Sequence, residues 1–156
     1  MKNKNTSYRL LKTAILFLCL FSFSITNATE YFLRAVTSGT RNWTSSATWS
    51  TVSSASATNT GTYPGAGDSV FYDGSSTLNI PLNITTDVSC LSFTNINTGS
   101  GSNITIYIAS GVKLTIIENF EITGVSDIIK NITLTGSGTL IVDGDINIGT
   151  AGITST

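Results

Sequence analysis

The second half of the chain alternates apolar and polar residues with a period of two. The apolar positions that fall on one face of these runs are Ile104, Ile106, Ile108, Val112, Leu114, Ile116, Phe120, Ile122, Ile132, Leu134, Leu140, Val142, Ile146 and Ile148. Such alternation over short runs is typical of strands with one buried face, and the Gly, Asn and Asp residues between the runs predict tight corners. The pattern therefore predicts an all-β structure.

The segment before these runs is less regular. Residues 30–36 ("EYFLRAV") and 69–72 are predicted strands, and the glycines and proline of residues 64–68 predict a turn. Residues 37–62 are Ser, Thr, Ala, Asn and Gly, apart from Arg41, two tryptophans and a valine. We expect no regular helix in that stretch.

Two of the alternating segments resemble each other. Residues 103–124 ("NITIYIASGVKLTIIENFEITG") and 131–149 ("NITLTGSGTLIVDGDINIG") share an Asn-Ile-Thr start, a Ser-Gly corner and two strands. Self-similarity at such a period favours a solenoid, in which each turn of chain stacks on the previous one. An antiparallel β-sandwich is the alternative, because it also has short strands and regular turns.

The N-terminus is predicted to be a secretory signal peptide, residues 1–28. Basic residues precede an apolar run at 14–23, and small polar residues lead to a cleavage site between Ala28 and Thr29. A retained membrane anchor is the competing interpretation, but the run is shorter than the roughly 20 residues that a spanning helix needs. After cleavage we expect no membrane span and a secreted or cell-surface location.

Removal of the signal peptide changes the charge. Nine acidic residues then face four basic ones, for a formal net charge of −5, and charged residues are 11% of the whole chain. A protein that binds nucleic acid or an anionic membrane needs a basic face, so neither partner is expected. Ser, Thr, Asn and Gly take the place of charges, as in many exported β proteins.

Little in the sequence points to catalysis. The chain has no histidine, which excludes Ser-His-Asp and Cys-His arrangements and histidine zinc sites within it. Cys90 is the one cysteine left after cleavage and is predicted to be a small buried apolar residue. No Gly-rich phosphate loop precedes a helix, so we expect no cofactor and no metal.

Carboxylates leave a weaker possibility open. Asp143 and Asp145 are two residues apart, and Asp68 and Asp73 flank one predicted strand. Paired carboxylates can act as acid and base on a glycosidic bond. Aspartates that bind backbone groups at corners are the favoured interpretation, because that arrangement is much more frequent.

Three short motifs carry a resemblance to a known module. They are Asn42-Trp43, Thr48-Trp49-Ser50 and Pro64–Val70, followed by the strand pairs in "SGVKLTIIENFEITG" and "GSGTLIVDGDINI". Together they resemble a module near the N-terminus of large bacterial cell-surface proteins, similar to the eight-glycine domain. The resemblance implies a right-handed parallel β-helix, here with an aromatic N-terminal cap.

Proteins with this module generally continue for many hundreds of residues and often end in a sorting domain. This chain departs from that pattern, because it stops at "GTAGITST" after a predicted strand with no capping segment. We therefore expect either a truncated chain or a partner that covers the last rung. The partner would be the downstream part of a longer chain or a second copy.

The two tryptophans have two possible roles. Trp43 and Trp49, with Phe32, Tyr63 and Phe71, would cover the first rung of a solenoid, which nothing else stacks on. The alternative is a carbohydrate-binding platform made by Trp43, Trp49 and Tyr63, with a polysaccharide as partner.

The expected organisation has three parts. Residues 1–28 are the signal peptide, 29–62 a Ser/Thr-rich capping segment and 63–156 the solenoid rungs. The expected function is structural or adhesive, as part of an exported cell-surface protein, and not enzymatic. A carbohydrate-binding module is the second hypothesis, and a fragment of a polysaccharide lyase or hydrolase is the third.

Overall fold

The computed structural model of the chain describes six stretches of residues, 28–34, 39–73, 80–96, 104–123, 131–149 and 152–155. The described residues form strands and one short 3-10 turn, η1 (Ser46–Thr48), so the predicted all-β structure is confirmed. The predicted signal peptide lies outside the described residues, except for Ala28 at its end.

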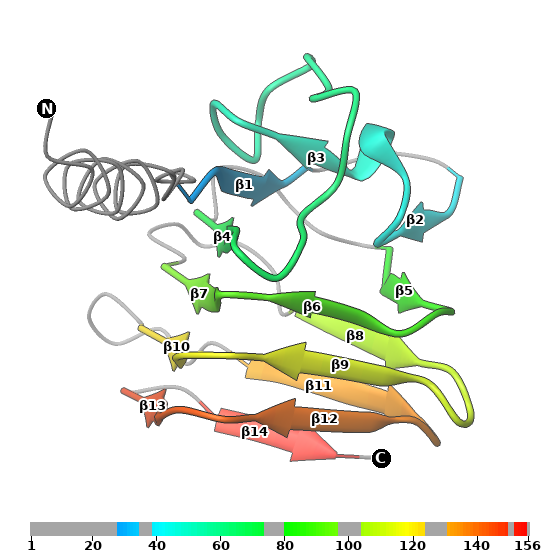
Figure 1. The fold of residues 1–156 in the computed structure, drawn as a ribbon, viewed down its shortest axis with the longest axis vertical. Helices are drawn as coiled ribbons and strands as arrows, with labels where there is room; N and C mark the ends of the chain where they lie inside the picture. The colour runs from blue at the N-terminus through cyan, green and yellow to red at the C-terminus, as the bar shows by residue number, and fades with distance from the viewer. Residues whose placement is uncertain are drawn as a thin grey trace, which may run out of the picture.

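The strands form three sheets (Figure 1). The six-stranded sheet contains β13 (Ile146–Ile148), β10 (Phe120–Ile122), β7 (Ser92–Asn95), β4 (Ser69–Tyr72), β1 (Glu30–Leu33) and β3 (Trp49–Ser50), in that order. The five-stranded sheet contains β14 (Gly152–Ser155), β11 (Asn131–Gly136), β8 (Ile104–Ile108), β5 (Leu82–Ile84) and β2 (Arg41–Asn42). The three-stranded sheet contains β12 (Thr139–Val142), β9 (Lys113–Ile116) and β6 (Val88–Cys90).

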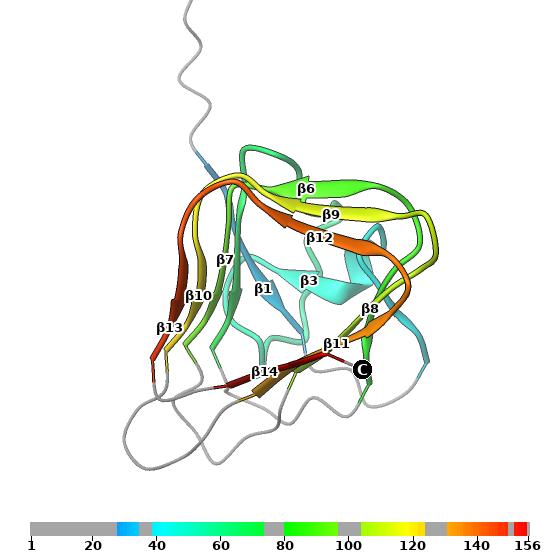
Figure 2. The same cartoon turned by 90° about the horizontal axis from the view of Figure 1, so that it is seen from below.

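The chain passes through the three sheets in a fixed order. From β5 onward it visits the five-stranded, three-stranded and six-stranded sheets in turn, and it repeats this order up to β14. Of the strand pairs among the described residues, β1 with β3 is antiparallel and the other ten are parallel. Figure 2 shows the three sheets around a shared interior, with one sheet along each side.

The register places like residues next to each other. Ile132 lies opposite Ile104, which is 28 residues earlier, and Leu140 lies opposite Leu114, which is 26 residues earlier. The two segments that resemble each other in sequence are therefore neighbours in the same sheets. Asn103, the first residue of the earlier segment, lies outside the described residues.

The alternating apolar residues face the shared interior. In β8, β9 and β10 the predicted inward residues are buried, and these are Ile104, Ile106, Ile108, Leu114, Ile116, Phe120 and Ile122. Ile146 and Ile148 in β13 differ, because they are 54% and 43% exposed. Among the described strands β13 pairs with β10 alone, so no further described strand lies beyond β13 to cover Ile146 and Ile148.

The predicted corners at Ser110–Gly111 and Gly144 are present, and glycine is required there for two reasons. Gly111 has φ +74°, a backbone conformation that residues with a side chain rarely adopt. Gly144 lies directly against the preceding corner, where a methyl group would overlap the carbonyl oxygen of Glu118. The corner at Gly144 thus lies close to the corner before it because Gly144 lacks a side chain.

Residues 29–62, the expected capping segment, contribute strands to two of the sheets. Its strand β1 pairs in parallel with β4, and β2 pairs in parallel with β5. Arg34 holds the irregular part in place, since its guanidinium donates hydrogen bonds to the carbonyl oxygens of Ala47, Ser56 and Ala57 at 2.7, 2.8 and 2.6 Å. The composition of the sequence did not predict these contacts of Arg34.

Candidate functional site: the tryptophan pair and the Tyr63 groove

Trp43 and Trp49 form a buried pair under the first strands. Trp43 is 1% exposed and Trp49 is 0% exposed, and their rings meet edge to face at 5.0 Å between centroids. The indole of Trp49 donates to the carbonyl oxygen of Trp43 at 2.6 Å, and the indole of Trp43 donates to that of Pro64 at 3.1 Å. Every polar atom of the two side chains is therefore satisfied inside the protein.

The burial of the two tryptophans bears on both hypotheses for them. A sugar platform needs an exposed ring face, and neither Trp43 nor Trp49 presents one. Tyr31 accompanies them inside, and its ring lies edge to face with Trp49 at 6.4 Å. Tyr72, Phe93 and Phe120 belong to the same buried core. A carbohydrate surface that includes the tryptophans is thus incompatible with their burial.

The other three aromatic residues that we expected to cover the first rung lie elsewhere. Phe32 and Phe71 are register partners in β1 and β4, they are half-buried, and their rings stack at 5.6 Å. They occupy the face opposite to Tyr31 and Tyr72, because adjacent residues of a strand point to opposite sides. The expectation that Phe32 and Phe71 cover the first rung was wrong, because the buried aromatic residues of these strands are their neighbours Tyr31 and Tyr72.

Tyr63 is 46% exposed and borders a shallow groove of about 230 Å³. The groove lies beside β6, the first strand of the three-stranded sheet, on the side where the other two sheets continue with β2 and β4. The residues that line it are Thr44, Tyr63, Pro64, Gly65, Thr86, Asp87, Val88 and Ser89. The groove exists because irregular chain, and not a strand, lies next to β6.

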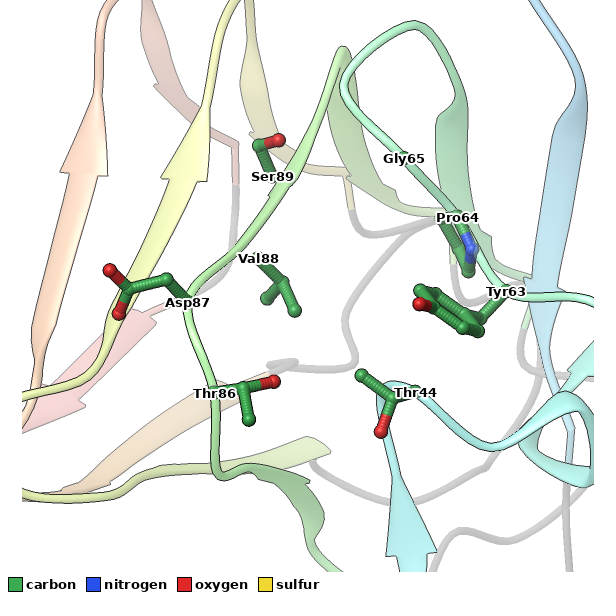
Figure 3. A pocket seen from close by; sticks show the side chains of 8 residues that line it. All are labelled: Thr44, Tyr63, Pro64, Gly65, Thr86, Asp87, Val88 and Ser89. Carbon is green, nitrogen blue, oxygen red and sulfur yellow. The ribbon is translucent and has the colours of Figure 1, made fainter.

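The lining of the groove is neutral and hydroxylated. In Figure 3 the side chains of Thr44, Tyr63 and Val88 point toward one another across the groove, whereas Asp87 points away. Asp87 is occupied on the far side, where its carboxylate accepts a hydrogen bond from the backbone N–H of Lys113 at 2.9 Å. An aromatic face among hydroxyl groups suits a neutral ligand better than a charged one.

Of the predicted site residues, the structure places Tyr63 at the groove and buries the two tryptophans behind it. Sequence analysis missed Thr44, Thr86 and Ser89. They come from two segments about 40 residues apart, and Ser and Thr are so frequent in this chain that composition could not single them out.

Two of the predicted corner aspartates bind backbone groups. Asp68 accepts hydrogen bonds from the N–H groups of Thr29 and Gly65 at 3.1 and 2.9 Å, and Asp73 accepts one from Ser54 at 3.1 Å. The favoured interpretation is therefore confirmed for Asp68, which binds Gly65 of its own turn, whereas the bond of Asp73 is to a residue 19 positions away.

Asp143 and Asp145 flank the Gly144 corner. Both are exposed, and they lie on the chain between β12 and β13. No enclosed cavity surrounds them among the grooves lined by described residues.

Cys90 and Arg41 are among the ionisable groups that are buried. Cys90 is fully buried, as predicted, and burial with the nearby charge of Asp68 raises the pKa of its thiol to about 12. Arg41 is also buried, and this was not predicted. Desolvation lowers the pKa of Arg41 to about 10, while one guanidinium nitrogen donates to the carbonyl oxygen of Ile80.

Within the described ranges, no cluster of three or more Cys, Asp or Glu side chains is placed to hold a metal ion. The same part of the chain contains no helix with the length and hydropathy needed to cross a membrane. Comparison with known proteins adds no assignment, since no protein-family model, curated protein or solved structure matches this chain.

Proposed function

We propose that this chain is a structural or adhesive segment of an exported cell-surface protein, built as a right-handed parallel β-helix. The observation that carries the proposal is the repeated passage of the chain through three parallel sheets in one order. A chain that returns to the same sheet every 26 to 28 residues, as β9 to β12 and β8 to β11 do, advances by one strand per turn.

Other features support the same architecture. Parallel strands need a crossover connection, which the other two sheets supply, and such crossovers are right-handed in almost all proteins. The antiparallel sandwich requires neighbouring strands to run in opposite directions, whereas the parallel pairs here run from β1 and β4 to β11 and β14. The resemblance to the N-terminal module of bacterial surface proteins leads to the same proposal.

The exposed apolar side of the last layer is where this segment would join a partner. Ile146 and Ile148 are exposed beside the partly buried Val142, at strands that each pair with one neighbour among the described residues. The occupant that fits is another parallel rung with apolar inward residues, since it would cover the isoleucines and continue the hydrogen-bond ladders. A downstream segment or a second copy would supply it.

The native product tests this proposal. An antibody against residues 29–156, used on blots of fractionated source cells, reports both location and mass. A surface band far above the 16.4 kDa of the chain supports a long solenoid with downstream rungs. A surface band just below that mass supports self-association, and a band confined to the cytoplasm contradicts the proposal.

Two matched variants test self-association. Sedimentation of the processed protein would compare Ile146→Ser with Tyr107→Ser, because Tyr107 is also exposed but lies on β8, away from the last layer. If copies stack through β13, Ile146→Ser produces monomer and Tyr107→Ser does not. Equal behaviour of the two variants contradicts stacking through this side.

Carbohydrate binding is the second candidate, and the Tyr63 groove is the observation that favours it. The ring is exposed, and the three hydroxyl side chains of Thr44, Thr86 and Ser89 line the same groove. The direct test is retention on polysaccharide gels for the wild type and Tyr63→Ala. Trp fluorescence is a poor reporter here because both tryptophans are buried. Retention that survives Tyr63→Ala unchanged removes the groove from the proposal.

A further inference from the structure

The position of Thr29 relative to Asp68 ties the predicted processing site to the fold. The backbone N–H of Thr29 donates to Asp68 Oδ1 at 3.1 Å, and the carbonyl oxygen of Thr29 accepts from the N–H of Ser69 at 3.0 Å. These bonds extend the parallel pairing of β1 with β4, in which Glu30 lies opposite Ser69. Thr29 is thus held at both of its backbone groups.

Asp68 is fixed by its own turn. Its second oxygen, Oδ2, accepts from the N–H of Gly65 at 2.9 Å, and its backbone N–H donates to the carbonyl oxygen of Gly65 at 3.0 Å. Its carbonyl oxygen accepts from the N–H of Leu91 at 2.8 Å. Among the described residues, the carboxylate is bonded by neutral backbone donors and by no cationic side chain. A negative charge is therefore held in place beside the nitrogen of Thr29.

Cleavage would change the nature of that nitrogen. Hydrolysis of the Ala28–Thr29 bond by a signal-peptide-cleaving endopeptidase consumes one water molecule. It leaves a carboxylate on Ala28 and an amino group on Thr29, which takes up a proton at neutral pH. Both residues are exposed. The neutral amide donor at 3.1 Å from Asp68 then becomes an ammonium group at the same place.

We propose that Asp68 is the binding site for the α-ammonium group of the processed chain, whose first residue is Thr29. This rests on the export step of the proposed function. The uncleaved chain has a neutral hydrogen bond at this place, and the processed chain has a charge-assisted one, which is stronger. Processing therefore stabilises the β1–β4 pair, next to the buried tryptophans. A chain that begins at Glu30 lacks the nitrogen that Asp68 binds.

The test begins with the N-terminus of the native product. The full chain is expressed in an exporting bacterial host, purified from outside the cytoplasm and sequenced from its N-terminus. A first residue of Thr29 is expected. An exported chain with another first residue overturns the Asp68 proposal and leaves the proposed function standing, whereas a chain that keeps Met1 in the cytoplasm overturns both.

Periodate then removes the ammonium group selectively. It cleaves the bond between the amino- and hydroxyl-bearing carbons of an N-terminal threonine, leaving an aldehyde and releasing acetaldehyde and ammonia, while periodate is reduced to iodate. Lysine side chains lack the neighbouring hydroxyl group and do not react. Urea unfolding of treated and untreated protein is compared for the wild type, Asp68→Asn and the matched control Glu30→Gln.

The expected result is a change that depends on Asp68. Periodate treatment raises the equilibrium constant for unfolding about two- to fivefold in the wild type and in Glu30→Gln, which is the range for a partly exposed ion pair. It leaves the equilibrium constant of Asp68→Asn unchanged. Equal changes in all three proteins overturn the proposal. If Asp68→Asn does not fold, the α-amine pKa of the wild type decides. A value above the usual ~7.7–8.0 supports the pair, and a value within or below that range overturns it.

Discussion

Replacing Trp49 with alanine removes the side chain that closes the interior beneath β1. Trp49 is fully buried, its ring contacts those of Trp43 and Tyr31, and its indole N–H bonds the Trp43 carbonyl oxygen at 2.6 Å. Deleting a buried aromatic side chain of this size costs about 3–5 kcal/mol, which includes the cavity left behind. The free energy of unfolding of a whole domain is only about 5–15 kcal/mol, so the variant retains only part of the wild-type value.

A milder substitution separates packing from hydrogen bonding. Trp49→Phe keeps much of the ring contact but leaves the buried carbonyl oxygen of Trp43 without its donor, at a cost of about 1–3 kcal/mol. Tyr63→Ala is the matched control, because Tyr63 is 46% exposed. A surface replacement of this kind changes the free energy of unfolding by less than about 0.5 kcal/mol.

Urea unfolding followed by circular dichroism measures all three variants. With a slope of about 2 kcal/mol per molar urea, Trp49→Ala lowers the midpoint by about 2 M and Tyr63→Ala barely moves it. A loss below about 1 kcal/mol for Trp49→Ala refutes the burial of the tryptophan pair, because so small a loss is typical of exposed side chains.

Three further predictions follow from the described contacts. Gly144→Ala places a methyl group against the Glu118 carbonyl oxygen and lowers the free energy of unfolding by about 1–3 kcal/mol. Gly67→Ala is the control, because Gly67 has open space around it. Equal losses in the two variants would contradict the close approach of the two corners. Arg34→Lys loses the guanidinium group that binds three carbonyl oxygens, so limited proteolysis of residues 46–57 is faster. An unchanged cleavage rate contradicts the role of Arg34 in holding this segment. Cys90 in the native protein, with its pKa raised to about 12 from 9.0, reacts with a disulfide reagent at pH 8 only as fast as the chain unfolds, and rapid labelling of the folded protein contradicts this. Because the unfolded chain loses the thiol proton first, the contribution of Cys90 to stability is lost as the pH rises from about 9 to about 12.

The periodic half of the chain was the predictable half. Each strand from β8 to β12 follows apolar residues two apart, and the corners follow glycine, since period-two burial and chain reversal are local properties of the sequence. Ile146 and Ile148 follow the same pattern yet are exposed. Alternation specifies which side of a strand is apolar but not what covers that side.

The irregular segment was predicted less well, because its structure depends on contacts between distant residues. Nothing near Arg34 in sequence indicates the carbonyl groups 13 to 23 residues later that its guanidinium binds. Phe32 and Tyr31 are both aromatic, and only the pairing with β4 decides which of them faces the interior. The Tyr63 groove also depends on pairing, since it forms beside β6, which pairs on one side only among the described strands.

The stacking of successive turns is the central claim, and engineered disulfides test it most directly. Thr94, Glu121 and Asn147 form a column on β7, β10 and β13, with Glu121 paired to each of the other two. Neighbouring strands lie about 4.8 Å apart, within the range that a disulfide bridges, whereas the two outer strands lie about twice as far apart. We predict that cysteine pairs at 94/121 and 121/147 form disulfides under mild oxidation and that a 94/147 pair does not. A bridge at 94/147, or none at 121/147, would contradict a chain that advances by one strand per turn.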